Sequence, residues 1–195
     1  MSLDNKLYFK VVLAGEAGVG KTSLRRSYLG VGFQTQHLST IGADFASYST
    51  KINEQRVNFQ IWDLAGQDIF ESMRNLYYKG SLGALMVFDV TDISSLEALN
   101  NWIIELEKNS GRGIVPFSIL GNKVDLLDEE ELNKIRKNVN SVLKKYNKKF
   151  VSKGFSINYF ETSAKTGHNV KIAFNNLGES IFNYLEFRRK KREES

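Results

Sequence analysis

Residues 15–22 read GEAGVGKT, and this stretch decides the fold. It fits the pattern G-x-x-x-x-G-K-[ST], follows the apolar run LYFKVVL of residues 7–13, and opens a segment with helical periodicity. A glycine-rich loop that enters a helix presents backbone amides and the positive end of the helix dipole to phosphate groups. Lys21 adds a point charge, and Thr22 adds a hydroxyl group for Mg²⁺. The stretch therefore predicts a triphosphate-binding loop, formed by Gly15, Glu16, Ala17, Gly18, Val19, Gly20, Lys21, Thr22 and Ser23.

Three downstream segments supply the other contacts that one guanine nucleotide needs: DLAGQ (63–67), NKVD (122–125) and TSAK (162–165). Asp63 ends the apolar strand FQIW, which places its carboxylate near the Mg²⁺ side of the phosphates, either directly or through water. Taken alone, DLAG is equally typical of an ordinary strand-to-turn transition. Downstream of a phosphate loop, the metal-site interpretation is the stronger one.

The segment NKVD predicts the choice of base. A carboxylate on Asp125 can accept hydrogen bonds from both N1–H and the exocyclic amino group of guanine, whereas adenine lacks that pair of donors. Lys123 can lay its aliphatic stem over the base, and Asn122 can connect this segment to the phosphate loop. In the TSAK turn, Ser163, Ala164 and Lys165 complete the base side, where the Ala164 amide is the main candidate donor to the guanine carbonyl. Each segment alone could be a polar turn at a strand end, and only their combination favours a site for GTP or GDP.

The remaining pattern predicts an α/β fold in one domain. Strands are expected at 7–13, 43–51, 56–62, 84–89, 117–121 and 156–161, with helices at 92–108, 129–147 and 169–187, in the order βαββαβαβαβα. Segments 43–51 and 56–62 should form an antiparallel hairpin at a sheet edge. Repeated crossovers require a mainly parallel sheet covered on both faces, with ligands beyond the carboxyl ends of the strands. Gly178, inside the last predicted helix, looks like a weak point that costs about 1 kcal/mol relative to Ala.

Composition narrows the function classes. The 195 residues contain 42% hydrophobic and 25% charged residues and no cysteine, so we expect a soluble cytoplasmic protein without disulfides, secretory signal or prenyl anchor. The net charge is +5, but five of the 27 basic and two of the 22 acidic residues lie in 188–195, which leaves +2 for the remainder. We therefore expect no nucleic-acid partner. The run from Arg188 to Arg192 leaves weak contact with an anionic membrane open, although a solvated helix end is the simpler interpretation.

The chain resembles Ras-superfamily small GTPases, closest to the Rab branch, over about residues 7–187. The resemblance rests on STIGADF (39–45), FQIWDLAGQDIF (59–70), YYKGSLGALMVFDVTD (77–92), GNKVDL (121–126) and ETSAKTG (161–167). It implies a small GTPase domain over 1–187 with a polybasic tail at 188–195, a P-loop NTPase fold with sheet order 2-3-1-4-5-6, and separate GDP and GTP states. It also implies a monomer that meets effectors, exchange factors and GTPase-activating proteins.

The resemblance also assigns roles to single residues. Thr40 would join Thr22 on Mg²⁺, Gly66 would donate its amide to the γ-phosphate, and Gln67 would orient the attacking water, so that Gln67, Lys21 and Thr40 carry catalysis. Phe33 would pack edgewise on the base, unless it is a loop aromatic buried in the core. No residue can be assigned as an arginine finger in cis, and slow intrinsic hydrolysis is expected.

Several residues depart from the family pattern. Ala17 stands where many relatives have Gly or Ser, and its methyl group either hinders a partner or is simply accommodated. His37, near a common Tyr, is expected to be an exposed loop residue rather than a pH switch. Leu64 and Ile69 make the second switch more apolar, which indicates an apolar effector surface or tighter packing in the free protein. Rab proteins usually end in prenylated cysteines, whereas the given sequence ends in RRKKREES, which leaves open whether this end is the native one.

Two other functions remain open from sequence. Ala17 makes a module that binds GTP without hydrolysing it conceivable, and a P-loop ATPase linked to nucleic acid is a third class. Retained Thr40 and Gln67 argue against the first alternative. Equal affinity for ATP and GTP would favour the P-loop ATPase.

Overall fold

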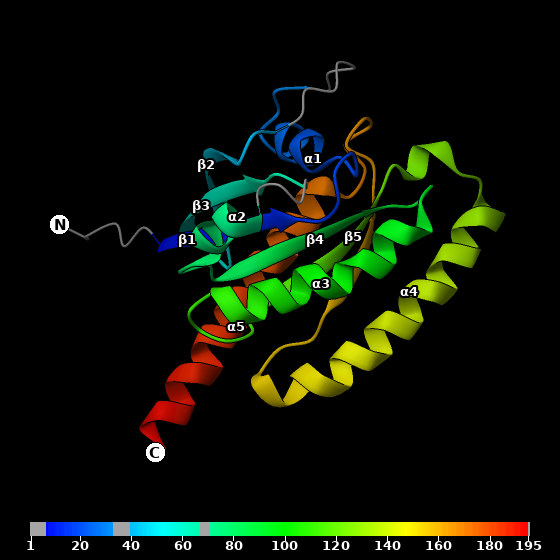
Figure 1. Ribbon diagram of the computed structural model, residues 1–195. Coiled ribbons are helices and arrows are strands. Elements are labelled where there is room, and N and C mark those ends of the chain that lie inside the picture. Colours follow the sequence, from blue (N-terminus) through cyan, green and yellow to red (C-terminus); the bar gives the residue numbers. More distant parts are fainter. Residues whose placement is uncertain (1–6, 33–39, 67–70, 195) are drawn as a thin grey trace.

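The computed structural model describes residues 7–32, 40–66 and 71–194, without the side chains of residues 71–73 (Figure 1). The predictions made for Phe33, His37, Gln67 and Ile69 therefore fall outside the described residues. Within these ranges, no helix is both long and apolar enough to cross a membrane.

Six strands form one sheet in the order β2-β3-β1-β4-β5-β6, which confirms the predicted topology. All neighbouring strands are parallel except the β2–β3 pair. The strands are β1 Leu7–Ala14, β2 Ala43–Ile52, β3 Gln55–Leu64, β4 Gly83–Asp89, β5 Phe117–Asn122 and β6 Asn158–Thr162. The helices are α1 Lys21–Tyr28, α2 Glu71–Tyr78, α3 Ile93–Asn109, α4 Glu129–Phe150 and α5 Val170–Glu193, with short 3₁₀ helices η2 Val124–Leu126 and η3 Val151–Lys153.

Strand β1 shows why helices must cover both faces of this sheet. Successive side chains of a strand point to opposite faces, so Phe9, Val11 and Leu13 face one way, whereas Val12 and Ala14 face the other. The first set packs in a core with residues of α1 and α5, and the second set packs in a core with residues of α3 and α4. In Figure 1, α3 and α4 accordingly lie in front of the sheet and α5 lies behind it.

The β2–β3 hairpin is confirmed at the edge of the sheet. Its ladder closes at the pair Ile52–Gln55, so only Asn53 and Glu54 form the turn. Both have positive φ angles, 48° and 59°, as a two-residue type I′ turn requires. The hairpin carries Asp63 near the end of β3, next to the carboxyl end of β1.

The structure overturns one prediction about packing and decides between the two alternatives that were open for Leu64. Gly178 is not a weak point in α5: a Cβ atom there would lie 2.1 Å from Cδ1 of Ile52 and 3.1 Å from the Phe59 ring, so the missing side chain lets the helix approach the sheet. Leu64 is fully buried in the core shared with α3, so it adds no apolar effector surface and only the tighter-packing alternative holds for it. Helix α5 is also longer than predicted, because it continues through the basic residues to Glu193.

Candidate functional site

The phosphate-binding loop lies between β1 and α1, and close contacts with neighbouring strands require two of its glycines. A Cβ atom on Gly15 would lie 2.1 Å from the carbonyl oxygen of Val87 in β4, and one on Gly20 would lie 2.3 Å from Nδ2 of Asn122 in β5. Both residues also have positive φ angles, 141° and 98°. The loop is thus pressed against the ends of two neighbouring strands, and helix α1 begins directly after it at Lys21.

Lys21 directs its ammonium group back into this loop. Its Nζ donates to the carbonyl oxygens of Gly15 and Glu16, at 2.6 and 2.7 Å. Burial lowers the pKa of Lys21 to about 8, and the nearby carboxylates of Asp63 and Glu16 act in the opposite direction. A buried cation held by two carbonyls at the start of a helix is a fitting partner for a phosphate group.

Three residues predicted for the metal side meet at one point. The Thr22 hydroxyl donates to Oδ2 of Asp63 at 2.6 Å and lies 3.1 Å from the Thr40 hydroxyl. Asp63 is fully buried, and burial raises the pKa of its carboxyl group although the Thr22 bond and Lys21 oppose the shift. Its Oδ1 has no hydrogen-bond partner among the residues that the structure describes. A buried oxygen without a partner, beside two hydroxyl groups, fits Mg²⁺, which binds hard oxygen ligands and retains waters. Ser23 follows Thr22 in the same turn of α1.

Gly66 lies against the phosphate loop, as its predicted role requires. A Cβ atom at this position would lie 2.3 Å from the amide nitrogen of Ala17 and 2.5 Å from the carbonyl carbon of Glu16. The preceding amide, of Ala65, donates to the carbonyl oxygen of Gly42 at 2.8 Å. The segment after β3 is therefore fixed both to the loop and to the chain that follows Thr40. Ala17 itself is exposed and is not among the residues with positive φ, which favours its simple accommodation in the loop.

Asn122, the last residue of β5, connects the phosphate loop with the TSAK turn. Its Nδ2 donates to the carbonyl oxygen of Val19 in the phosphate loop at 2.9 Å, and its Oδ1 accepts from the amide of Ala164 at 3.1 Å. On the base side, the Ser163 hydroxyl donates to Oδ1 of Asp125 at 2.5 Å. Nζ of Lys165 lies 4.0 Å from the other carboxylate oxygen of Asp125. The NKVD and TSAK segments thus meet each other, and Asn122 connects them to the loop.

Two base-side groups have partners that the sequence did not indicate. The Ala164 amide, predicted to donate to guanine, already donates to Asn122, so it would have to share or exchange this bond. The ammonium group of Lys123 forms an ion pair with Asp89 at the end of β4. This pair fixes the end of the Lys123 side chain, whose backbone is left-handed with a φ of 72°. Gly18 shows no close neighbour at its Cβ position, so its role as a phosphate-loop residue stays a prediction.

A cluster of four side chains behind the phosphate loop was missed. The indole Nε1 of Trp102 in α3 donates to the Glu16 carboxylate at 2.9 Å. The guanidinium of Arg74 in α2 lies 4.4 Å from the Trp102 ring centroid and donates to both carboxylate oxygens of Glu105, at 2.9 and 3.2 Å. A buried indole N–H usually needs an acceptor, which was the available signal. Its acceptor lies 86 positions away in the chain, and that pairing could not be read from the sequence.

An aromatic patch beside the site was also missed. The rings of Phe45 and Trp62 have centroids 5.1 Å apart, and those of Trp62 and Tyr77 are 5.4 Å apart. Phe45 is 48% exposed, and Ile41 and Leu76, which lie close to Phe45 and Tyr77 in the sequence, are also exposed. The patch spans β2, β3 and α2, so it lies on the elements that follow Thr40 and Gly66. The sequence did offer a sign of this patch, because alternate side chains of β2 point away from the core and Phe45 is one of them.

A glycine-rich loop between a strand and a helix, a hydroxyl–carboxylate cluster for Mg²⁺ and a carboxylate turn for guanine define the class of GTP-binding P-loop proteins. Comparison with known proteins agrees. The model of the Ras family matches residues 10–183. Rab-13 of Mesocricetus auratus is 36% identical over 173 residues, which cover 89% of this chain and 79% of the relative. The GTP-binding protein yptV5 of Volvox carteri is 37% identical over 89% of this chain and 82% of its own length, and RABG3b of Arabidopsis thaliana is 38% identical over 89% and 83%.

The chain therefore belongs to the Ras family, with Rab proteins among its relatives. It is a small GTPase that binds GTP and GDP with Mg²⁺, hydrolyses GTP to GDP, and works with regulator and effector proteins.

Proposed function

We propose that the protein is a slow GTP-hydrolysing switch in which the two segments around Thr40 and Gly66 change conformation with the state of the γ-phosphate. The observation that carries this proposal is the joined cluster of Thr22, Asp63 and Thr40. It brings the start of α1, the end of β3 and the Thr40 segment to one point. Loss of the γ-phosphate would release Thr40 and Gly66 together.

In the proposed reaction, water attacks the γ-phosphate in line, without a covalent intermediate. Lys21 holds positive charge against the phosphates, and the amides of the loop and of Gly66 stabilise the negative charge that develops on their oxygens. Gln67 orients the attacking water. Thr22, Thr40 and Asp63, the last through water, hold Mg²⁺, which neutralises phosphate charge when it is bound.

Guanine selection is assigned to Asp125, which Ser163 orients. The two donors of guanine pair with its two carboxylate oxygens, whereas adenine lacks that pair of donors. Sites of this kind discriminate by a factor of about 10⁴ to 10⁵. Phe33, Lys123, Ala164 and Lys165 are proposed to complete the base side.

The aromatic patch of Phe45, Trp62 and Tyr77 is the proposed contact for partner proteins that distinguish the two states. Exposed aromatic side chains are enriched where proteins bind one another. Because the patch follows Thr40 in the chain, a change at Thr40 would alter its outline.

We propose a monomer that acts in membrane traffic, with weak membrane contact through residues 188–192.

A single-turnover assay of γ-phosphate release tests the catalytic assignment. We expect Gln67→Leu to slow release at least tenfold with little change in GTP affinity, because the residue acts on the water rather than on the nucleotide. Gln55→Leu, at the exposed first residue of β3, is the matched control and should leave the rate unchanged. Equal rates for wild type and Gln67→Leu would refute the role of Gln67.

Measured affinities for GTP, GDP and ATP with Mg²⁺ test the base assignment. We expect ATP to bind at least about a thousandfold more weakly than GTP, and Asp125→Ala to remove most of this difference. Equal ATP and GTP affinities for the wild-type protein would end the guanine argument.

A further inference from the structure

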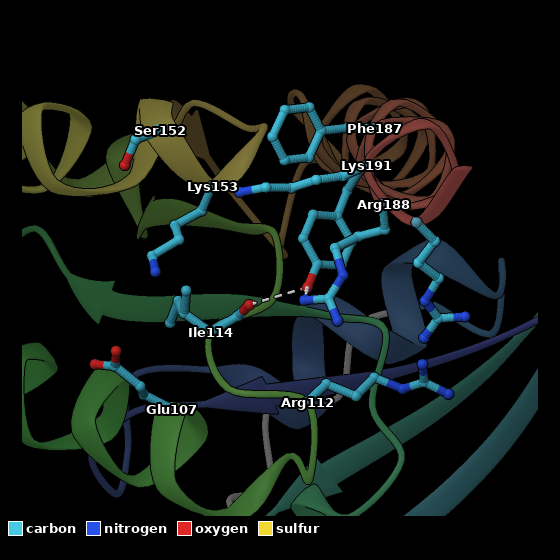
Figure 2. Close-up of a pocket in the computed structure, with 10 residues that line it drawn as sticks. Glu107, Arg112, Ile114, Ser152, Lys153, Phe187, Arg188 and Lys191 are labelled. Atoms are coloured by element: carbon cyan, nitrogen blue, oxygen red, sulfur yellow. Dashed lines mark hydrogen bonds between the residues drawn. The ribbon is translucent and has the colours of Figure 1, made fainter. Parts of the chain in front are cut away.

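A second concave site lies at the other end of the sheet from the nucleotide site. It is a cleft of about 390 Å³ between the loop that precedes β5, the 3₁₀ helix η3 and the last turns of α5. Five basic residues line it, Arg112, Lys153, Arg188, Lys191 and Arg192, together with one acidic residue, Glu107. Figure 2 shows Lys153 and Lys191 on facing walls, with Arg112 on a third. We call this site the basic cleft.

The charges of the basic cleft come from three separate parts of the chain. Arg188, Lys191 and Arg192 belong to the terminal basic run, but Arg112 and Lys153 do not. Glu107, the only acidic lining residue, accepts a bond from Lys149 at 2.9 Å. The described contacts of Arg188 are with a neutral group: it donates to the Tyr184 hydroxyl at 3.3 Å and lies 5.8 Å from that ring. The fold therefore concentrates positive charge in a hollow rather than along a chain end.

Packing fixes the walls of the basic cleft. Tyr184 forms its floor, is 3% exposed, and donates its hydroxyl to the carbonyl oxygen of Ile114 at 3.4 Å. Gly154, directly after η3, has a φ of 91°, and a Cβ atom there would lie 2.3 Å from Cδ1 of Phe187. The absence of a side chain at Gly154 thus lets η3 press against α5. Lys191 extends over the Phe187 ring, 5.9 Å from its centroid.

We propose that the basic cleft binds a small polyol that carries several phosphate groups, such as the headgroup of a phosphorylated inositol lipid or the free inositol phosphate. Guanidinium and ammonium groups that converge on one hollow can each donate to a different phosphate oxygen. The volume of the cleft lies in the range of small-molecule sites, and its charge would repel a cationic ligand and offers little to an apolar one. A long nucleic acid fits less well, because the charge converges on one point while the rest of the chain is nearly neutral.

Two double variants separate the cleft from the linear basic run. Arg112→Gln with Lys153→Gln removes two charges of the cleft and none of the run. Arg189→Gln with Lys190→Gln removes two charges of the run, neither of which lines the cleft; Arg189 lies 3.7 Å from Glu193 instead. All four residues are exposed, so both proteins should fold, and unchanged GDP release from each will verify this.

Binding is measured with the full chain loaded with GDP and Mg²⁺. One arm titrates inositol trisphosphate by calorimetry. The other uses phosphatidylcholine vesicles that contain phosphatidylinositol bisphosphate, compared with vesicles brought to the same total charge by phosphatidylserine. We expect the Arg112/Lys153 variant to bind at least about tenfold more weakly than wild type, and the Arg189/Lys190 variant to bind within about twofold of it.

The outcomes are distinct. Dependence on Arg112 and Lys153 with the free trisphosphate supports a soluble ligand, and the same dependence only on bisphosphate vesicles supports a lipid headgroup. Equal weakening by both variants, equal binding to phosphatidylserine vesicles, binding of single-stranded RNA alone, or no binding to either probe would overturn the proposal. The inference does not rest on the hydrolytic mechanism, so none of these results alters the test of Gln67.

Discussion

Replacing Asn122 with Ala should both lower the free energy of unfolding and speed the release of GDP. Asn122 is 1% exposed, and its amide satisfies the Val19 carbonyl at 2.9 Å and the Ala164 amide at 3.1 Å. Each buried backbone group left without a partner costs about 1–3 kcal/mol, so the free energy of unfolding should fall by about 2–6 kcal/mol. Because the two groups belong to the phosphate loop and to the base-side turn, GDP should also leave at least about tenfold faster, which corresponds to about 1.4 kcal/mol.

The assay compares urea unfolding at saturating GDP and Mg²⁺ with the release of a fluorescent GDP analogue. Asn147→Ala is the matched control, because the Asn147 amide likewise bridges both backbone groups of one residue, Ile157, at 3.3 and 2.6 Å, far from the nucleotide site. It should lower the free energy of unfolding without changing GDP release. If Asn122→Ala also leaves release unchanged, Asn122 is only a structural residue and the bridging argument fails.

Three further changes have expected outcomes. Gly178→Ala should lower the free energy of unfolding by about 1–3 kcal/mol in chemical denaturation, because its Cβ would lie 2.1 Å from Ile52, and a stabilised variant would contradict this packing. Trp102→Phe removes the bond to Glu16, so it should lower the free energy of unfolding by about 1.5–3 kcal/mol and speed GDP release. A wild-type free energy of unfolding together with a wild-type release rate would show that the contact is dispensable. Burial lowers the pKa of Lys21 to about 8 from 10.5, so between these values the unfolded chain holds more protons and this group makes the free energy of unfolding rise with pH. A phosphate group favours the protonated form, so GDP binding just above pH 8 should take up a proton, measured by calorimetry in buffers of different ionisation enthalpy; Lys21→Met should abolish the uptake.

The succession of strands and helices along the chain and the placement of the motifs could be predicted from local patterns, whereas the sheet order 2-3-1-4-5-6 was implied by the resemblance to Ras-superfamily GTPases. The apolar run before Gly15, the hairpin and the repeated crossovers require a mostly parallel sheet, and parallel strands bring their carboxyl ends to one edge. Asp63, Asn122 and Thr162 all lie at such ends. The meeting of Thr22 with Asp63 follows from this arrangement, whereas the place of Thr40 beside them was implied by the family resemblance.

What escaped prediction depends on contacts between distant parts of the chain. Gly178 has an unfavourable local propensity, but a Cβ atom there would lie 2.1 Å from Cδ1 of Ile52, so any larger residue would force Ile52 to move. The helix that carries Trp102 was predicted from the sequence, whereas the bond of Trp102 to Glu16 depends on how α3 is rotated against the phosphate loop. Arg112 and Lys153 are unremarkable exposed residues in the sequence, and only the fold brings them to the end of α5.

The position of the C-terminal end of α5 determines whether the nucleotide site and the basic cleft can be occupied at the same time. The nucleotide site lies beyond the carboxyl ends of the strands, and the basic cleft lies where β5 and β6 begin, so strands of five to eight residues, about 17–26 Å long, separate them. A ligand in the basic cleft would therefore not block the nucleotide site. The two ligands can bind and leave in any order. The protein could therefore bind a phosphorylated ligand in the basic cleft and hydrolyse GTP at the same time. Each ligand would have its own affinity and its own residence time.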